Sequence, residues 1–312
     1  MPKKLKKPAD CIASLVVNGL HGRFLRIPVS KKNKRPPSEI LLIYGHHSSL
    51  ERMYAIAESL SRHGNVTMPD LPGFGGMDSF YKIGEKPSLD NMADYLATFI
   101  KLKFKNKKLH IGGMSFGFLV VTRMLQKYPE MTKQVASLVS IVGFLSYRDF
   151  KFKKSTYLTI RWLSSICSTR VIAGVCKYLV LRPLFIRWVY IAQSKKNPKM
   201  KDADRVERDK RIGFEIKLWQ CNDIRTYMDT TVTMMLVNLT KTKIGLPVWH
   251  IAVDTDQYFD GRKVRASMRK VFKKITVYKA KISSHAPTII SNSDEVNSLI
   301  PKEIRKELAK IK

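Results

Sequence analysis

The chain of 312 residues is 44% apolar, so it can bury a large core and is not intrinsically disordered. Its 57 lysine and arginine residues outnumber 25 aspartate and glutamate residues, which gives a net charge of +32 spread along the whole chain. This spread does not favour specific nucleic-acid recognition; the charge reflects a general lysine bias or attracts anionic lipid. Four cysteines without metal-site or disulfide-scaffold spacing, and an N-terminal region without an export-signal pattern, predict a cytoplasmic protein.

The first part of the chain alternates strands and helices. Two short β-type runs at 14–17 and 23–29, separated by the turn residues Asn18-Gly19, predict a hairpin. The continuous apolar run at 40–44 predicts a strand that is buried on both faces. The pattern then predicts a helix at 50–61, a strand at 65–68 and a helix at 88–102. This alternation is typical of a parallel sheet covered by helices on both faces.

The next unit carries the pattern Gly113-Met114-Ser115-Phe116-Gly117 between an apolar strand and a helix at 118–127. Such a turn holds the serine hydroxyl out at the strand tip, and the small residues on either side keep strand and helix from colliding. A strand follows at 135–144, and the chain from 147 to 245 is then helical, aromatic and basic. The alternation resumes with strands at 246–253 and 274–278 and with helices at 261–271 and from about 293. We therefore expect a core at 1–146 and 246–312, with a helical insert at 147–245.

The order of these signals resembles the α/β-hydrolase fold and, within it, the serine esterases and lipases with a helical cap. The resemblance covers residues 12–145 and 246–310. It is carried by a strand ending in Tyr44-Gly45, the run Asp70-Leu71-Pro72-Gly73-Phe74-Gly75, the Ser115 turn, Pro129-Glu130, Asp256 after a strand, and His285-Ala286-Pro287. It implies an α/β architecture with a mostly parallel central sheet flanked by helices, and an insert that caps the site.

A serine hydroxyl needs a base before it can attack an acyl carbon, and the base needs a third group to orient it. The resemblance implies that Ser115 is the nucleophile, His285 the base and Asp256 the acid. Asp254, two residues before Asp256, is an alternative acid, and Asp260 is a more distant one. Dehalogenases and epoxide hydrolases of similar layout use an aspartate nucleophile, and Ser115 occupies that place.

The resemblance also implies an oxyanion hole formed by the backbone N–H groups of Phe116 and His46. Tyr44 stands where relatives carry a histidine, which changes how this loop is braced. Phe118 replaces a residue that is often small in relatives, and we expect it to crowd the floor of the pocket.

Two further patterns are weak. His46 and His47 lack the additional ligands of a metal site. The glycine run at 73–76 lacks the Gly-Lys-Ser/Thr ending of a phosphate loop and is expected to be structural. The sequence therefore indicates no metal and no cofactor.

The insert is expected to select the substrate. Its run at 157–192 is apolar but contains Pro183 and five basic residues: Arg161, Arg170, Lys177, Arg182 and Arg187. It therefore predicts packed cap helices, or a basic surface in peripheral contact with an anionic membrane, and not a membrane span. In the stretch 222–239, the residues expected to line the pocket or the core are Met228, Met234, Met235 and Leu236.

The expected activity is hydrolysis of a small-molecule carboxylic ester with an apolar acyl group, such as a lipid. An acyltransferase or a thioesterase would use the same residues. A protein that kept the fold without the chemistry would act as a binding protein through its basic surface. The sequence predicts neither the identity of the substrate nor the oligomeric state.

Overall fold

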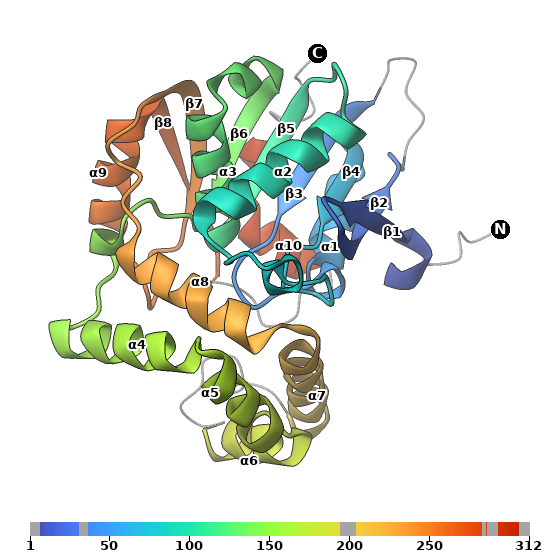
Figure 1. The fold of residues 1–312 in the computed structure, drawn as a ribbon. Helices are drawn as coiled ribbons and strands as arrows, with labels where there is room; N and C mark the ends of the chain where they lie inside the picture. The colour runs from blue at the N-terminus through green and yellow to red at the C-terminus, as the bar shows by residue number, and fades with distance from the viewer. Residues whose placement is uncertain (1–6, 31–36, 194–203, 283–284, 286–292, 306–312) are drawn as a thin grey trace.

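The computed structural model describes residues 7–30, 37–193, 204–282, 285 and 293–305 (Figure 1). At its centre the described residues form an eight-stranded sheet in the order β1-β2-β4-β3-β5-β6-β7-β8. The strands are β1 (Ile12–Val17), β2 (Leu20–Ile27), β3 (Ser38–Ile43), β4 (Gly64–Pro69), β5 (Leu109–Met114), β6 (Val135–Ile141), β7 (Ile244–Ala252) and β8 (Phe272–Lys279). Strands β1 and β2 are antiparallel to their neighbours, and the pairs from β4 to β8 are all parallel.

The sheet opens with the hairpin that the sequence predicts. Val17 pairs with Leu20, and the two residues between them, Asn18 and Gly19, have φ angles of 51° and 78°. Two consecutive left-handed residues are what a two-residue hairpin turn needs if its twist is to match that of the strands. The hairpin prediction is therefore confirmed.

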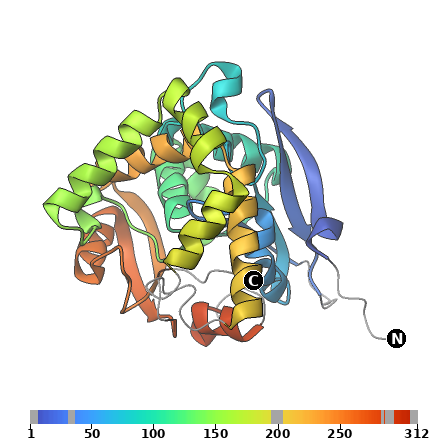
Figure 2. The same ribbon diagram turned by 90° about the horizontal axis from the view of Figure 1, so that it is seen from below.

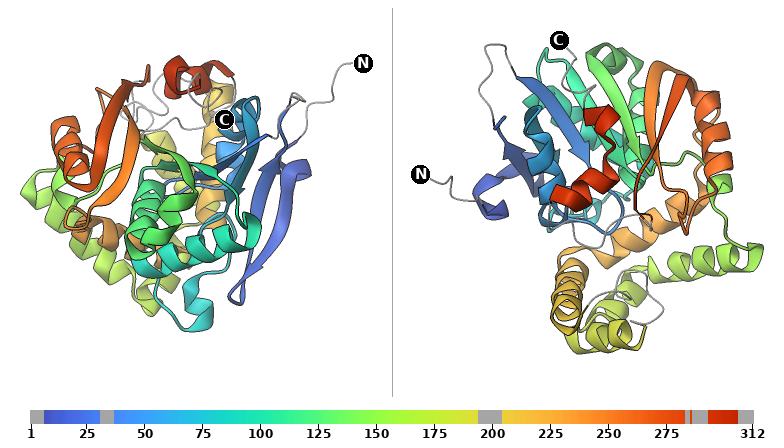
Figure 3. Two further views of the ribbon diagram at one scale, coloured as in Figure 1. Left: turned by 90° about the horizontal axis from the view of Figure 1, so that it is seen from above. Right: turned by 180° about the vertical axis from the view of Figure 1, so that it is seen from behind.

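Helices cover both faces of the sheet. Figure 3 shows α2 (Leu89–Lys103) and α3 (Phe116–Lys127) side by side on one face, and α1 (Leu50–Leu60) and α10 (Ser293–Leu299) on the other. Helix α9 (Gly261–Val271) precedes β8 and begins at the residue predicted from the sequence. The α/β architecture with a mostly parallel sheet is therefore confirmed.

The predicted boundaries differ from the observed ones by up to three residues, and one difference has a clear cause. The sequence predicts a strand at 135–144, but β6 ends at Ile141. The next residue, Val142, has a φ angle of 46°, so the chain leaves the extended conformation there although the apolar run continues. Phe144 then packs on the rings of Phe150 and Phe259, at centroid distances of 5.2 Å and 4.3 Å.

A helical insert joins β6 to β7. It contains α4 (Lys154–Cys167), α5 (Arg170–Val175), the π-helical turn η5 (Cys176–Val180), α6 (Pro183–Ala192), α7 (Arg205–Cys221) and α8 (Ile224–Leu236). Figures 1 and 3 show α8 between the sheet and α4, and Figure 2 shows the insert lying across one end of the molecule. Within the described ranges no single helix has the length and apolar composition to cross a membrane. Helix α4 and residues 170–180 have that length and composition only when taken together, and they form a pair bent by 89°.

Candidate active site

Ser115 lies at a sharp turn between β5 and α3. Its backbone has a φ of 48° and a ψ of −115°, a conformation that residues with a side chain rarely adopt. The residues two positions before and after Ser115 must be glycines, because neither position has room for a side chain. A Cβ on Gly113 would lie 2.7 Å from Cα of Phe118, and one on Gly117 would lie 2.3 Å from the carbonyl oxygen of Tyr44. The turn therefore has the shape that the sequence predicts, with Ser115 at the carboxyl end of its strand.

The side chains of Ser115, His285 and Asp256 form a hydrogen-bonded chain. Ser115 Oγ lies 3.0 Å from Nε2 of His285, and Nδ1 of the same ring lies 2.6 Å from Oδ2 of Asp256. His285 and Asp256 are 8% and 7% exposed. The structure thus brings together three side chains that lie up to 170 residues apart in the chain. Ala286 and Pro287, the other residues of the histidine motif, lie outside the described residues.

The loop after β7 holds Asp256 in place. Its Oδ1 accepts hydrogen bonds from the backbone N–H groups of Tyr258, at 2.8 Å, and Phe259, at 3.2 Å. Burial alone would raise the pKa of Asp256, but hydrogen bonds from His285 and the two backbone groups hold the pKa below its usual value. Asp256 is therefore a carboxylate at neutral pH. The rings of Tyr258 and Phe259 each pack 5.3 Å from the ring of His285.

The two alternative acids point elsewhere. The side chain of Asp254 is 66% exposed and pairs with Lys279 at 2.9 Å. Asp260 accepts hydrogen bonds from the N–H groups of Arg262 and Lys263 and so caps α9. Of the three aspartates, only Asp256 contacts the His285 ring.

The two residues expected to form the oxyanion hole lie on either side of Ser115. Phe116 begins α3 directly after it. Gly45 packs against Ser115 so closely that an added Cβ would lie 3.3 Å from Ser115 Cβ, and His46 is the next residue. Nε2 of His46 lies 2.9 Å from Oγ1 of Thr230, which ties this loop to α8. Burial and the nearby His47 lower the pKa of His46 to about 3, so its ring is neutral at pH 7.

A cavity of about 500 Å³ lies beside Ser115 and His285. Its apolar lining comes from the core and from the insert: Phe150, Phe152, Ile160, Met234, Met235, Tyr258 and Phe259. The sequence groups Met228 and Leu236 with Met234 and Met235 as candidates to line the pocket or the core. Met228 and Leu236 do not line the cavity, and Leu236 is exposed. Candidates at positions 228, 234, 235 and 236 of one helix cannot all face the same way, because the helix turns by about 100° per residue.

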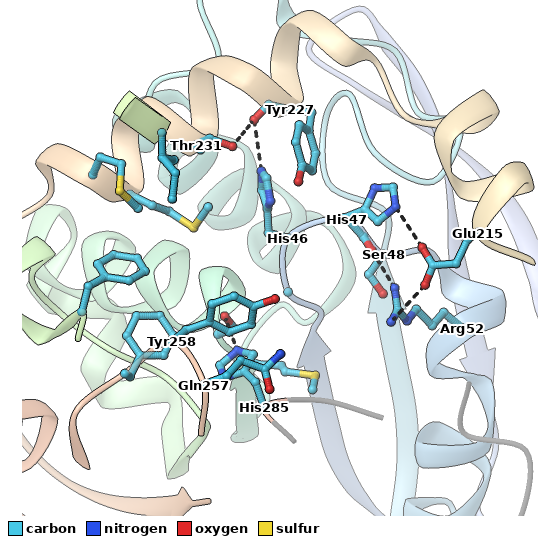
Figure 4. A pocket seen from close by; sticks show the side chains of 18 of the residues that line it. His46, His47, Ser48, Arg52, Glu215, Tyr227, Thr231, Gln257, Tyr258 and His285 are labelled. Atoms are coloured by element: carbon cyan, nitrogen blue, oxygen red, sulfur yellow. Dashed lines mark hydrogen bonds and ion pairs between the residues drawn. The ribbon is translucent and has the colours of Figure 1, made fainter. Parts of the chain in front are cut away.

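A second part of the cavity is polar. Glu215 on α7 is fully buried and lies 3.3 Å from Nε2 of His47 and 3.9 Å from Arg52. Tyr190 donates a hydrogen bond to the same carboxylate at 3.1 Å. Figure 4 shows His47, Arg52 and Glu215 together on one side of His46, away from Tyr258 and His285.

The sequence analysis missed this polar group. The available signal is the position of Glu215 on α7, between two buried apolar residues three positions away on either side, Ile212 and Leu218. Residues at this spacing share a helix face, so a carboxylate stands where a core residue is expected. Such a carboxylate needs charged or hydrogen-bonding partners.

Comparison with known proteins concerns the fold. A family model described as alpha/beta hydrolase fold matches residues 40–157, which include most of β3 and the Ser115 turn. Among solved structures, a putative lipase from Acinetobacter baumannii AYE superimposes with a TM-score of 0.63 at 18% identity, covering 95% of this chain and 91% of that one. This chain has the α/β-hydrolase fold.

Other solved structures share the fold. An esterase from Thermogutta terrifontis matches with a TM-score of 0.59 at 15% identity, covering 95% of each chain. The epoxide hydrolase CorEH matches with a TM-score of 0.64 at 13% identity, covering 96% of this chain and 97% of that one. No curated protein sequence matches this chain. At these identities the likeness concerns the architecture of an α/β-hydrolase and not its substrate.

Tyr44, a departure from the α/β-hydrolase pattern, braces the loop after β3 through its hydroxyl. The hydroxyl donates to Oδ1 of Asp70 at 2.9 Å and accepts from the N–H of Leu71 at 2.8 Å. The other oxygen of Asp70 accepts from Arg23 at 3.0 Å. Burial raises the pKa of Asp70 to about 7, although Arg23 and the Tyr44 hydrogen bond act in the opposite direction. The strand end is thus anchored to the glycine loop through a buried polar network.

All four N–H groups of the glycine run at 73–76 are hydrogen-bonded within the protein. The N–H groups of Gly73, Phe74 and Gly76 donate to backbone carbonyls, and that of Gly75 donates to the side chain of Asn222 at 2.8 Å. The run therefore joins the core to the end of α7 and does not present a free nest of donors to a phosphate.

Phe118 does not crowd the pocket. It is fully buried, packs 5.8 Å from the ring of Phe272, and is absent from the cavity lining. Its ring fills the space left by Gly143, where an added Cβ would lie 2.5 Å from Cδ1 of Phe118. The expectation of a crowded floor was wrong because the side chain packs against Gly143 and Phe272 and not into the cavity.

Proposed function

We propose that this protein is a serine hydrolase that cleaves a carboxylic ester with an apolar acyl group. The observation that carries the proposal is the hydrogen-bonded chain from Ser115 through His285 to Asp256 at the wall of a cavity. A serine, a histidine and an ionised carboxylate in this order are the groups that acyl transfer through a serine ester requires. Ser115 stands where an epoxide-opening relative would need an aspartate.

In the first half of the proposed reaction, Ser115 Oγ attacks the ester carbonyl carbon while its proton passes to Nε2 of His285. Asp256 accepts the Nδ1–H hydrogen bond and stabilises the imidazolium that forms. The negative charge on the carbonyl oxygen is stabilised by the backbone N–H groups of Phe116 and His46. His285 then returns the proton to the departing alcohol oxygen, which leaves an acyl ester on Ser115.

In the second half, water replaces the alcohol. His285 takes a proton from the water as its oxygen attacks the acyl carbon, and the same oxyanion donors bind the new tetrahedral intermediate. Collapse of this intermediate releases the carboxylic acid, and the proton on His285 returns to Ser115. Atoms balance as ester plus water giving acid plus alcohol, and no cofactor takes part in these steps.

The cavity supports the choice of an apolar acyl ester. Four insert helices contribute to its lining, through Ile160, Tyr190, Trp219 and Met234, so we propose that the insert acts as the cap that selects substrate. The methionine and phenylalanine side chains that line the cavity together with Ser115 favour an acyl chain. The polar group around Glu215 suits the alcohol portion, which carries hydroxyl or charged groups.

A fluorophosphonate probe tests the proposal, because it modifies only a serine activated by a neighbouring base. We expect labelling of Ser115, loss of labelling in Ser115→Ala, and hydrolysis of nitrophenyl esters by the unmodified protein. Ser146→Ala is a matched control, since Ser146 is buried outside the cavity lining. Absence of labelling in a folded protein contradicts the proposal and leaves a binding protein. Product analysis with added alcohols or thioesters would identify an acyltransferase or a thioesterase.

A further inference from the structure

Exposed apolar side chains gather on one part of the insert. Of the 21 large hydrophobic residues that are exposed among the described residues, 14 lie between 158 and 191. Three of the most exposed are Leu184 at 83%, Trp162 at 67% and Trp188 at 65%. Monomeric proteins seldom leave such a group in water, because apolar surface is costly to hydrate.

The exposed residues follow helical spacing. On α4, Leu158 and Trp162 are four residues apart; on α5, Val171 and Val175 are four apart; on α6, Leu184 and Trp188 are four apart. Residues at this spacing share one face of a helix. Each of these helices therefore turns an apolar stripe outward, which is the reverse of the usual arrangement around a core. We call these six residues the outward apolar face.

The inner sides of the same helices are already used. Ile160 of α4 and Tyr190 of α6 line the cavity, and Ser164 of α4 is buried. Figure 1 shows α4, α5 and α6 on the far side of α8 from the sheet. The outward apolar face is thus separate from the proposed active site, although the two share helices.

The charge around this face has one sign. Residues 154–193 contain six basic residues and no aspartate or glutamate. Arg161, Arg170, Lys177 and Arg182 are exposed, and Arg187 pairs with Asp209 of α7 at 3.0 Å. Two copies of the face would bring like charges together on association, which disfavours a homodimer. A partner that is both apolar and anionic matches both features.

We propose that the outward apolar face and its basic residues form a docking surface for an anionic lipid bilayer. Tryptophan and leucine side chains enter the boundary between headgroups and acyl chains, and the arginines remain at the level of lipid phosphates. The helices lie along the surface, because each carries a charged residue within or beside its apolar stripe and the chain bends by 89° between α4 and 170–180. Nucleic acid is less suitable, since aliphatic residues such as Leu184 gain nothing from a phosphate backbone.

Binding of the full chain to vesicles tests the proposal independently of hydrolysis. We expect binding to phosphatidylcholine vesicles that contain phosphatidylglycerol, with weaker binding without it and at high salt. Tryptophan fluorescence should shift to the blue on binding and be quenched by brominated lipid tails. Ser115→Ala should bind equally well, so the failure of the hydrolase proposal and the failure of this one are distinguishable.

Two sets of variants locate the surface. Replacement of Arg161, Arg170 and Arg182 by glutamate should lower the vesicle partition coefficient by at least about a hundredfold, because the loss of three basic residues near the lipid surface has about that effect and the added carboxylates are repelled by the lipid. The same replacement of Lys86, Lys105 and Lys270 changes the net charge equally, but at exposed sites outside the insert, and should have a much smaller effect.

For the apolar contacts, replacement of Trp162, Leu184 and Trp188 by serine should abolish the binding that survives high salt. Val16→Ser with Leu102→Ser removes exposed apolar residues elsewhere and should leave it intact. Equal effects of test and control sets, no binding by the folded protein, or a concentration-dependent dimer through this face without vesicle binding would each overturn the proposal.

Discussion

At the scale of single residues, the hydrogen bonds to Asp256 distinguish it from its neighbours. Its two oxygens are divided between His285 and the backbone N–H groups of the following turn, so the carboxylate can neither rotate away nor take up a proton easily. Asp254 is only two residues away, but its side chain faces solvent and Lys279. A pair of acids so close in sequence therefore allows a matched comparison.

We predict that Asp256→Asn lowers kcat for ester hydrolysis by about a thousandfold to ten-thousandfold, because the amide favours the wrong tautomer of His285 and cannot stabilise the imidazolium. Asp254→Asn should change kcat by less than about twofold, since it removes only a surface ion pair. Steady-state kinetics on one nitrophenyl ester measure both. A large loss in Asp254→Asn with little change in Asp256→Asn would place the acid elsewhere in this loop.

At the scale of elements, α8 sets the extent of the apolar part of the cavity. Thr231 and Met234 are one turn apart on this helix and both line the cavity, and His46 is tied to the preceding turn through Thr230. Met234 thus lies one turn beyond the residue that holds His46, towards the carboxyl end of α8. Its flexible side chain leaves room that a rigid ring would fill.

We predict that Met234→Trp shortens the acyl chain that the proposed hydrolase accepts. Each methylene excluded from the cavity should lower kcat/KM by about fourfold, because burial of one methylene contributes ~0.8 kcal/mol. Short-chain esters should be hydrolysed at nearly the original rate. Met228→Trp is the matched control, because Met228 is on the same helix but outside the cavity lining. Nitrophenyl esters of increasing chain length provide the measurement; a uniform loss at every length would mean that the cavity part near Met234 does not hold the acyl group.

The elements differ in how far the sequence predicts them. Strands β3 and β5 are buried runs and the Ser115 turn is a local motif, so local pattern was sufficient to predict them. Glu215, His47 and Arg52 meet across more than 160 residues, and no local pattern connects them. Periodicity shows that Leu158 and Trp162 share a helix face but not whether that face points to the core or to water, so α4 to α6 were expected to pack as ordinary cap helices or to dock on lipid.

At the scale of the whole molecule, charge and apolar exposure are distributed differently. The net charge of +32 is spread over the chain, and the exposed apolar residues gather on the insert. Long-range attraction to an anionic surface would therefore act on the protein as a whole, and the outward apolar face would set its orientation. In that orientation the insert lies between the bilayer and the sheet, and its inner side lines the cavity beside Ser115.

A buried histidine in the core is expected to lower the stability of the folded protein at acid pH. His250 on β7 is 3% exposed and its Nδ1 lies 3.0 Å from Oγ of Ser140 on β6; burial lowers its pKa to about 4. The unfolded chain binds a proton at this histidine below about pH 6.5, so its contribution to stability is complete above pH 6.5 and is lost as pH falls towards 4. We predict that His250→Asn reduces the slope of unfolding free energy against pH by up to about 1.4 kcal/mol per pH unit in this window. Urea denaturation between pH 4 and 7 measures the slope; an unchanged slope, or a His250 resonance that titrates near pH 6.5, would contradict the prediction.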